Sequence, residues 1–262
     1  QSVKATGYAY YTSIQNAYYN QSAVTPLYAL LYKLTNNLSL YGNYVQGLQQ
    51  GSTAGSPAVN IGQIFAPYKT KQKEIGAKYD AGKIGMSVAL FTISQPNAYL
   101  DSNNVYGLNG EQRNRGAEFS VFGTPMRGLR LLGGVTLLDA KQEKTNGGLT
   151  NGKYVIGVPK TQANVGADWD VPGVQGLSLN ARAVYTSSQY ANVTNTQELP
   201  SWTRYDAGLR YTTAIGSKVV TIRGRVDNLF NKNYWASTGG SSSNYLVLGS
   251  PRTFTLSAAL DF

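Results

Sequence analysis

The stretch Pro251-Arg-Thr-Phe-Thr-Leu-Ser-Ala-Ala-Leu-Asp-Phe262 decides the fold of this chain. From Phe254 onward every second residue is apolar, and the residues between them are small or polar. Side chains alternate across a strand, so the stretch predicts an extended segment with one apolar and one polar face. An unpaired apolar strand at the edge of a soluble sheet, as in a β-sandwich, invites edge-to-edge pairing. The pattern therefore favours the closing strand of a transmembrane β-barrel, whose apolar face meets lipid.

The composition also argues against an ordinary soluble core. Tyr supplies 20 and Gly 29 of the 262 residues, charged residues make up only 14%, and Cys and His are absent. The absence of Cys fits passage through an oxidising periplasm, although chance explains it equally well. No apolar run approaches the roughly 18 residues of a membrane helix, so strands remain as the way to cross lipid.

The net charge of +10 raises the question of an anionic partner. Its basic residues are dispersed, without a run of five or six and without a basic helix, so nucleic acid is not expected as a partner. A basic surface instead suits an anionic small molecule, outer-membrane lipid or lipopolysaccharide. The net charge alone does not discriminate between these anionic partners.

One unit repeats along the chain: a strand, a tight turn, a second strand and a long loop. The rhythm predicts about eleven whole strands of roughly ten residues, plus a partial strand at residues 2–11 that leads into a loop. Short turns at one end and long loops at the other are typical of outer-membrane barrels, whereas a soluble β-sandwich has shorter strands and similar loops at both ends. The expected strand pairs are 28–32 with 38–44, 75–79 with 84–90, 117–121 with 129–137, 163–169 with 177–185, and 205–211 with 220–226, and the expected long loops are 47–70, 94–112, 142–160, 187–201 and 235–250.

The opposite face of these strands carries charges of both signs. Arginine and carboxylate side chains on it are expected to pair across strands in a polar barrel interior. The charged and amide residues on this face are Glu74, Lys78, Asp80, Glu118, Arg130, Gln162, Asn164, Asp168, Asn180, Arg182, Arg204, Asp206, Arg210, Arg223, Arg225 and Asp227.

Several motifs resemble those of TonB-dependent outer-membrane receptors. The segment Val226–Trp235 is similar to the Asn-Leu-Phe-Asp/Asn-Lys/Arg-x-Tyr motif of the penultimate strand in that family, and Gly249–Phe254 is similar to its Gly-x-Pro-Arg-x-Phe strand. The segments Ala66–Tyr79, Asn109–Glu118 and Pro200–Asp206 resemble the siderophore branch of the family.

The resemblance implies a ferric-siderophore receptor with a 22-strand barrel and a plugged lumen, in the outer membrane of a Gram-negative bacterium. Residues 1–262 would then be the C-terminal portion of the barrel. The plug, the N-terminal barrel half and the box that engages TonB are missing from it, so this piece is not expected to transport alone. A passive porin is the alternative, and an upstream plug with a TonB-engaging box would discriminate between them.

The sequence gives no support to catalysis. Gly147–Lys153 has the spacing of a phosphate-binding loop, but Tyr154 stands where Ser or Thr must hold Mg²⁺. Without His or Cys, the Ser-His and Cys-His nucleophile pairs are unavailable. Carboxylate-only chemistry stays formally possible, but no carboxylate pair is placed by sequence alone.

Aromatic residues are frequent in the expected loops, and they suit a partly apolar ligand that hides its metal among its own oxygens. Such a ligand, a transported ferric siderophore, needs no cofactor and no metal-binding residues in the protein. Trp235 and Tyr245 are the leading candidates because the resemblance places the last long loop over the lumen; Tyr106, Tyr190 and Arg113 are further candidates. For any single aromatic residue, however, an interfacial belt is favoured over ligand contact, and an ordinary strand-end charge explains Arg113 as well as an anionic ligand does. The other loop aromatics are Tyr10, Tyr11, Tyr18, Tyr19, Tyr99, Tyr154, Trp202 and Tyr234.

Overall fold

A computed structural model describes residues 1–8, 15–239 and 245–261. Apart from a short 3₁₀ turn, η1 (Asn146–Gly148), all the regular elements in these ranges are β-strands. They contain no helix that is long and apolar enough to cross a membrane. Tyr10, Tyr11 and Phe262, which the sequence placed in an aromatic loop and at the end of the closing strand, lie outside the described residues. The strands are β1 (Ser2–Tyr8), β2 (Gln15–Ser22), β3 (Leu27–Lys33), β4 (Leu38–Gln49), β5 (Tyr68–Asp80), β6 (Ile84–Leu100), β7 (Tyr106–Met126), β8 (Leu129–Lys144), β9 (Thr161–Asp170), β10 (Leu177–Thr186), β11 (Gln189–Tyr190), β12 (Glu198–Leu199), β13 (Trp202–Ile215), β14 (Lys218–Asp227), β15 (Trp235–Gly239), β16 (Tyr245–Leu248) and β17 (Thr253–Asp261).

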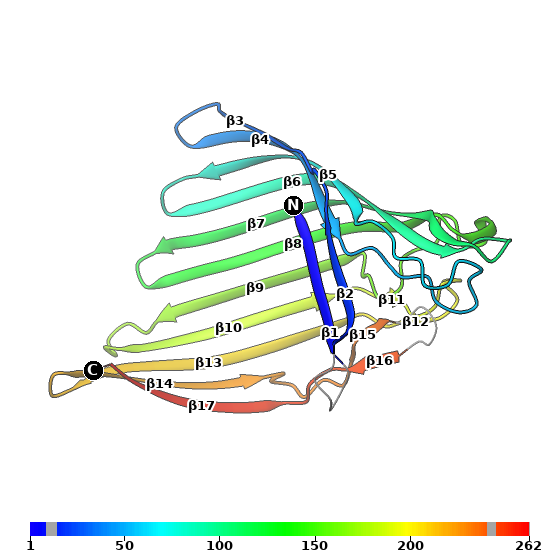
Figure 1. Cartoon of the computed structure of the whole chain (residues 1–262). Coiled ribbons are helices and arrows are strands. Elements are labelled where there is room, and N and C mark those ends of the chain that lie inside the picture. Colours follow the sequence, from blue (N-terminus) through cyan, green and yellow to red (C-terminus); the bar gives the residue numbers. More distant parts are fainter. Residues whose placement is uncertain (9–14, 240–244, 262) are drawn as a thin grey trace.

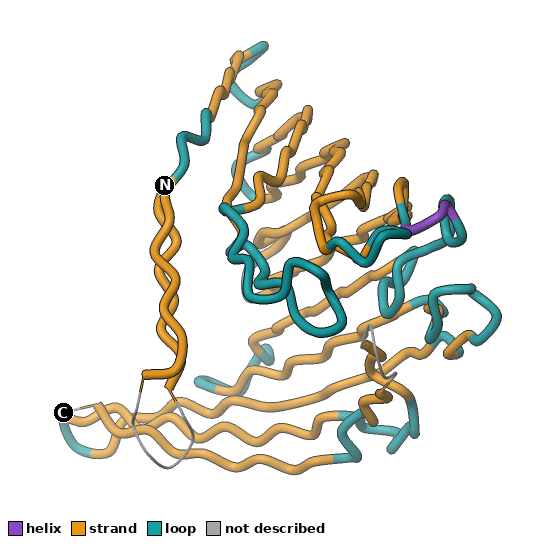
Figure 2. The backbone as a smooth tube through the Cα atoms, turned by 45° about the vertical axis from the view of Figure 1, so that its right-hand side comes forward, coloured by secondary structure: helices purple, strands orange, loops and turns teal. Residues whose placement is uncertain are grey.

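Eleven strands form one antiparallel sheet in the order β3-β4-β5-β6-β7-β8-β9-β10-β13-β14-β17. Each strand pairs with the next sheet strand along the chain, so the sheet is a meander that curves into an open trough (Figures 1 and 2). In the part of the chain that the structure describes, β3 and β17 have one sheet neighbour each and do not pair with one another. The expected eleven whole strands of a barrel wall are confirmed, and the wall is not closed.

The register keeps apolar side chains together on one face of the sheet, which we call the apolar face. Ile75 pairs with Leu90, Leu90 with Ala117, and Ala117 with Leu137. Similar rows continue to β17, and large residues on this face are open to the surroundings: Leu256 is 80% exposed. Because a soluble sheet would bury such side chains, this face is suited to contact with lipid.

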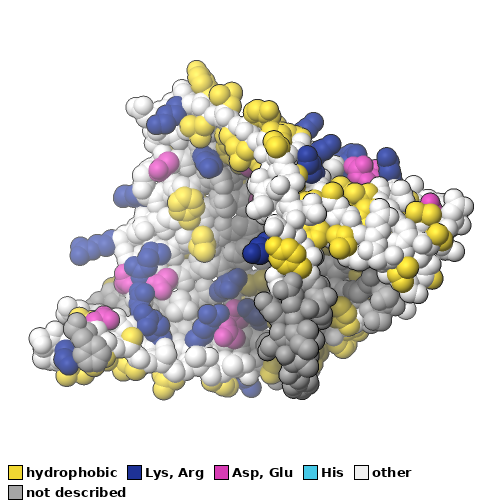
Figure 3. All heavy atoms as spheres, in the orientation of Figure 1, with side chains coloured by type: hydrophobic (Ala, Val, Ile, Leu, Met, Phe, Trp, Pro, Cys, Tyr) yellow, Lys and Arg dark blue, Asp and Glu magenta, His cyan; other side chains and the backbone are white. Residues whose placement is uncertain are grey.

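The other face, which we call the polar face, carries the charges that the sequence placed there. Figure 3 looks onto this face and shows acidic and basic side chains gathered along its hollow. Among the described residues the buried hydrophobic side chains are few and small or aromatic, with Leu199 the one large aliphatic side chain in that set. The hydrogen-bond ladders and the separation of apolar and polar side chains onto two faces therefore organise the strands. A shared apolar core does not.

Short turns close one end of the sheet, on the left in Figure 1, and long connections lie at the other end. The turns fall at residues 34–37, 81–83, 127–128, 171–176 and 216–217. Several need a positive φ, and Gly82 (φ 76°) and Gly173 (φ 80°) supply it. We call these two ends the turn end and the loop end.

Three expected loops contain more strand than the sequence indicated. Instead of a loop over 94–112, β6 runs to Leu100 and β7 begins at Tyr106. The pairing of β6 with β5 ends at Ser94, whereas its pairing with β7 continues beyond Pro96. Proline is tolerated at Pro96 because β6 is an edge strand there. The loop 187–201 includes the β11–β12 pair, and 235–250 includes the β15–β16 pair. Strands of up to 21 residues replace the expected length of roughly ten.

The expected partial first strand forms as β1, but it does not join the sheet. It pairs instead with β2, and the hairpin crosses the open side of the trough (Figure 2). The hydroxyl of Tyr19 ties the hairpin to the loop before β5: it accepts the Gly51 N–H and donates to the Phe65 carbonyl, both at 3.2 Å. The expected loop up to residue 23 is thus mainly β2.

Candidate functional site

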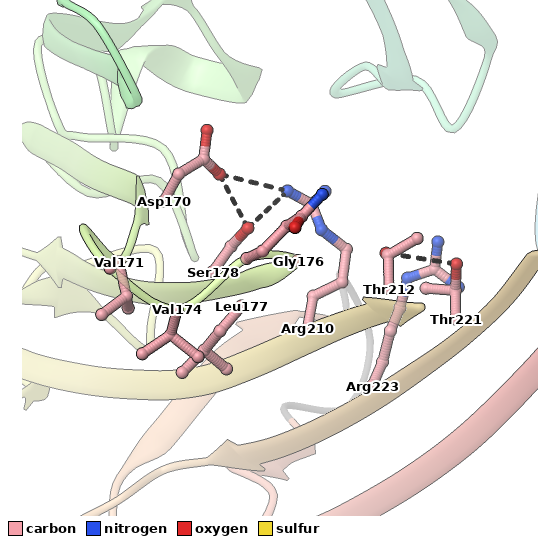
Figure 4. Close-up of a pocket in the computed structure, with 12 residues that line it drawn as sticks. Asp170, Val171, Val174, Gly176, Leu177, Ser178, Arg210, Thr212, Thr221 and Arg223 are labelled. Carbon is pink, nitrogen blue, oxygen red and sulfur yellow. Dashed lines mark hydrogen bonds and ion pairs between the residues drawn. The ribbon is translucent and has the colours of Figure 1, made fainter. Parts of the chain in front are cut away.

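A network of ion pairs spans the polar face near the turn end. Nε of Arg130 donates to Asp168 at 3.0 Å, and its Nη1 donates to Asp170 at 2.9 Å. Ser178 Oγ donates to Asp170 at 2.7 Å and accepts from Arg210 at 3.0 Å (Figure 4). These contacts link β8, β9, β10 and β13 and confirm the expected cross-strand pairing of opposite charges.

A cavity of about 740 Å³ opens beside this network, as Figure 4 shows. Arg210 and Arg223 contribute two guanidinium groups to its lining, against the single carboxylate of Asp170. Arg223 forms no ion pair with any described residue. The cavity therefore presents an excess of hydrogen-bond donors and positive charge toward the inside of the trough.

A second cluster lies at the loop end of the polar face. The rings of Trp202 and Tyr234 are 4.3 Å apart between centroids, and Arg204 donates to the Tyr234 hydroxyl at 3.4 Å. Asp206, which is buried, holds the Arg204 guanidinium at 3.0 Å. A Cβ at Gly249 would overlap the Tyr234 ring, so the absence of a side chain there lets the ring fit.

The indole nitrogen of Trp202 is buried and has no hydrogen-bond partner in the protein. An unsatisfied buried donor is costly, and such groups often mark a place where a ligand or water supplies the acceptor. Two stacked aromatic rings, a free N–H and a guanidinium can together bind a ligand that is partly apolar and rich in oxygen acceptors. We call Trp202, Arg204 and Tyr234 the rim cluster.

The five residues proposed from sequence do not form one site. Tyr190 stacks on Tyr154 at 5.7 Å, Tyr106 packs edge-on against Phe65 at 5.8 Å, and Arg113 binds Glu111 at 3.1 Å. This arginine lowers the pKa of the Glu111 carboxyl through the hydrogen bond between them.

Three of the five lie on neighbouring elements at the loop end. Trp235 and Tyr245 both belong to the β15–β16 hairpin, and Gln189, next to Tyr190, donates to the Ala236 carbonyl at 3.5 Å. Tyr106 lies apart, where Asn60 binds its backbone N–H and carbonyl at 2.9 Å each. Arg113 and Ala117 are four residues apart on β7, so their side chains lie on the same side of the sheet, that of the apolar face.

The rim cluster was not predicted from the sequence as one site, although the residue pattern of β13 indicates part of it. Trp202, Arg204 and Asp206 follow one another at alternate positions of β13, so strand periodicity places them on one face. Tyr234 comes from the segment after β14, and only the folded chain shows that it reaches Trp202. Among residues 1–8, 15–239 and 245–261, no group of three or more acidic side chains is arranged to hold a metal ion.

An antiparallel meander with one apolar and one charged face is the wall of a transmembrane β-barrel. Residues 1–229 match the family described as TonB dependent receptor-like, beta-barrel, and the chain belongs to that family. This agrees with the motifs in Val226–Trp235 and Gly249–Phe254.

The ferrichrome receptor FcuA of Yersinia enterocolitica is 42% identical over 245 residues, which cover 91% of this chain and 32% of FcuA. An uncharacterized TonB-dependent receptor of Haemophilus influenzae is 30% identical over 95% of this chain and 76% of its own length. The solved structure of BauA, the ferric preacinetobactin receptor of Acinetobacter baumannii, has a TM-score of 0.84 and 43% identity over 94% of this chain and 37% of BauA. The chain thus spans about a third of the length of FcuA and of BauA.

Proposed function

We propose that this chain forms the C-terminal portion of the barrel of a receptor that imports ferric siderophores with energy from TonB. The observation that carries the proposal is an identity of 42% with FcuA and 43% with BauA, over more than nine tenths of this chain. Both of those proteins are named as receptors for a ferric chelate or a siderophore. The family supports a location in the outer membrane of a Gram-negative bacterium.

The same proposal assigns the plug, the N-terminal barrel half and the contact with TonB to parts of a longer receptor. Its support is that the chain spans about a third of FcuA and of BauA. The open edges of β3 and β17 are suited to pair with further strands. The cation-rich cavity with Arg210 and Arg223 would then face the plug.

The rim cluster is our candidate for ligand contact. A chelate that surrounds its metal with oxygen atoms offers acceptors to Trp202 Nε1 and Arg204, and an apolar edge to the rings of Trp202 and Tyr234. Tyr190, Trp235 and Tyr245 lie at the same end of the trough and stay candidates. The metal arrives with its own ligands, so we propose neither a resident cofactor nor an enzymatic step.

The complete receptor that carries this chain provides the test. Its affinity for ferric hydroxamate, catecholate and mixed siderophores is measured by quenching of intrinsic fluorescence, for the wild type and for Trp202→Phe. The variant keeps a ring but loses the N–H, and we expect a five- to tenfold weaker affinity for the bound chelate, about the effect of one hydrogen bond. Trp169→Phe on the apolar face is the control.

Absence of binding for every class of ferric chelate would overturn the proposed function. Unchanged affinity in Trp202→Phe would remove the rim cluster from the binding site but leave the function in place. A passive porin, the alternative reading of the sequence, finds no support among the relatives named above. A porin would give a solute flux that depends on neither a chelate nor TonB.

A further inference from the structure

Three long connections at the loop end contact one another. They span residues 145–160, 187–201 and 228–252, and we call them loops A, B and C. Loops A and B are joined through their backbones, because the N–H of Gly157 in loop A donates to the Tyr190 carbonyl in loop B at 3.0 Å.

Loop C contacts both of the others. Gln189 in loop B donates to the Ala236 carbonyl in loop C at 3.5 Å, and the β11–β12 and β15–β16 hairpins lie close together in Figure 1. Gly157 has a φ of 70°, and a Cβ there would overlap the Thr238 carbonyl, so the backbone of loop A packs directly on β15. The three loops therefore form one network of contacts.

The contact between loops A and B centres on the side chain of Asn195. Its Oδ1 accepts the Tyr154 N–H at 2.7 Å, and its Nδ2 donates to the Tyr154 carbonyl at 3.1 Å. The backbone bonds of this segment to β8 are made by Lys153 and Val155, which turns the N–H and carbonyl of Tyr154 away from β8. Asn195 thus takes the place of a neighbouring strand for Tyr154 and satisfies both of its backbone groups.

The backbone at position 195 restricts which residue can make this contact. Its φ of 58° lies in the left-handed region, which favours asparagine and glycine. Asparagine alone of these two carries the donor and the acceptor that one peptide group needs. Asn104, between β6 and β7, has the same φ of 58°, and its side chain forms no hydrogen bond with any described residue. It is therefore a matched reference for Asn195.

The contact holds aromatic side chains that are available to a ligand. Tyr154 stacks on Tyr190, with 5.7 Å between the ring centroids. Tyr154 also lines a depression of about 460 Å³. Other residues of its lining are Asn97, Tyr99 and Gln142. Their amide and phenol groups both donate and accept hydrogen bonds, and the rings add apolar contact, as a chelate rich in oxygen atoms requires.

The same network supports the rim cluster. Trp202 follows loop B directly, and Tyr234 belongs to loop C. Loop A contacts loop B at Tyr190 and loop C at Thr238. Displacement of loop A would therefore loosen both segments that bring Trp202 and Tyr234 together.

We propose that Asn195 is a positioning residue for chelate binding. Its two hydrogen bonds to Tyr154 hold loops A, B and C in the binding arrangement before a ligand arrives, so binding does not have to order them. Asn195 acts through Tyr154 and needs no contact with the ligand. The inference rests on the proposed function, because siderophore affinity is one of its readouts.

The test uses the complete receptor purified in detergent and compares the wild type with Asn195→Gly and the control Asn104→Gly. Glycine keeps the left-handed backbone at both positions, but only at position 195 does it remove side-chain hydrogen bonds. Deuterium exchange at the Tyr154 and Gly157 amides should become about tenfold faster in Asn195→Gly and stay unchanged in the control. Asn195→Asp keeps an acceptor for the Tyr154 N–H, so exchange there should be slower than in Asn195→Gly.

Stopped-flow fluorescence with ferric hydroxamate, catecholate and mixed siderophores measures the association and dissociation rates. The affinity for the bound chelate should fall about three- to tenfold in Asn195→Gly, almost wholly through slower association, because only a fraction of the molecules then has ordered loops. Trp202→Phe removes a ligand contact instead and should mainly speed dissociation. The midpoint of urea unfolding should be the same in every variant, since the barrel wall is untouched.

The two proposals fail in different ways. Wild-type binding with an unchanged association rate in Asn195→Gly would overturn the positioning role alone, as would unchanged exchange at the Tyr154 amide. A loss of affinity that lies in faster dissociation would also overturn it, because Asn195 would then act as a ligand contact. Absence of binding by the wild type would overturn the proposed function, and the positioning role with it.

Discussion

Asn228 and Ser250 are joined across 22 residues, because Nδ2 of Asn228 donates a hydrogen bond of 3.0 Å to the Ser250 carbonyl. The same nitrogen donates to the Lys232 carbonyl at 2.9 Å, and Oδ1 accepts the Lys232 N–H at 2.8 Å. Asn228 is 1% exposed and has a φ of 53°, a left-handed conformation that Asn adopts more readily than most residues. It fixes both the exit of the chain from β14 and its return as β17.

Replacement of this side chain should destabilise the closing strand. Asn228→Ala loses the three hydrogen bonds of a buried side chain and leaves the Lys232 and Ser250 carbonyls without that donor, so we expect a loss of about 2–4 kcal/mol. Urea unfolding of the complete receptor in detergent measures it. Asn36→Ala, at an exposed turn, is the matched control and should change stability by less than about 0.5 kcal/mol. A loss of similar size in both variants would show that the hydrogen bonds of Asn228 are not its main contribution.

The contact between the β1–β2 hairpin and the loop before β5 depends on one hydroxyl. Tyr19→Phe keeps the ring but removes the bonds to Gly51 and Phe65, which contribute about 1 kcal/mol. We expect the Gly51 amide to exchange with solvent deuterium about fivefold faster, since local opening becomes easier by that amount. Tyr32→Phe, on the exposed apolar face, is the control. Unchanged exchange at Gly51 in Tyr19→Phe would mean that ring packing alone holds the hairpin.

The ion pair of Glu111 and Arg113 gives a pH dependence with a defined sign. Arg113 lowers the pKa of the Glu111 carboxyl in the folded protein, so its stabilisation is present above the ordinary pKa of Glu, about 4.3, and is lost as the pH falls through the lowered value. Both side chains are partly exposed, so the pair contributes less than about 1 kcal/mol.

Glu111→Gln should therefore be slightly less stable than the wild type at neutral pH and equal to it in acid. Urea unfolding at several pH values measures the difference, with Glu198→Gln as a control that makes no ion pair with any described residue. A difference that grows as the pH falls would contradict the assignment.

The two faces of the sheet should tolerate charge very differently. Val165 lies on the apolar face of β9 and is 56% exposed, whereas the adjacent Asn164 lies on the polar face. Val165→Arg places a charge in lipid, which costs about 2–4 kcal/mol near the membrane centre, and Asn164→Arg does not. The amount of folded receptor in outer membranes should fall in the first variant and stay near the wild-type level in the second. Equal yields would show that this face does not meet lipid.

The strands of the sheet could be predicted because the pattern that defines each strand lies within a few consecutive residues. Alternation in segments such as Phe254–Leu260 fixes the strand and its faces together, and the family motifs fix its place in the barrel. The β6–β7 extension was missed because Pro96 and Gly107 resemble loop residues, yet the two strands pair there as a ribbon that needs no further neighbour.

Pairing partners distant in sequence were harder to predict. Nothing near Ser2 in the sequence indicates that β1 pairs with β2 instead of joining the sheet, since both arrangements satisfy the backbone equally. The approach of Tyr234 to Trp202 likewise brings together two segments that are distant in the sequence, and sequence periodicity does not reveal it.

Uptake of radioactive iron by cells tests the central claim most directly. A strain without its own siderophore receptors expresses the complete receptor and is given ⁵⁵Fe-siderophores of the three classes, with and without a functional TonB. We expect uptake of at least one ferric siderophore that saturates with concentration and disappears without TonB. Uptake that is linear in concentration and independent of TonB would contradict the receptor assignment and identify a passive pore.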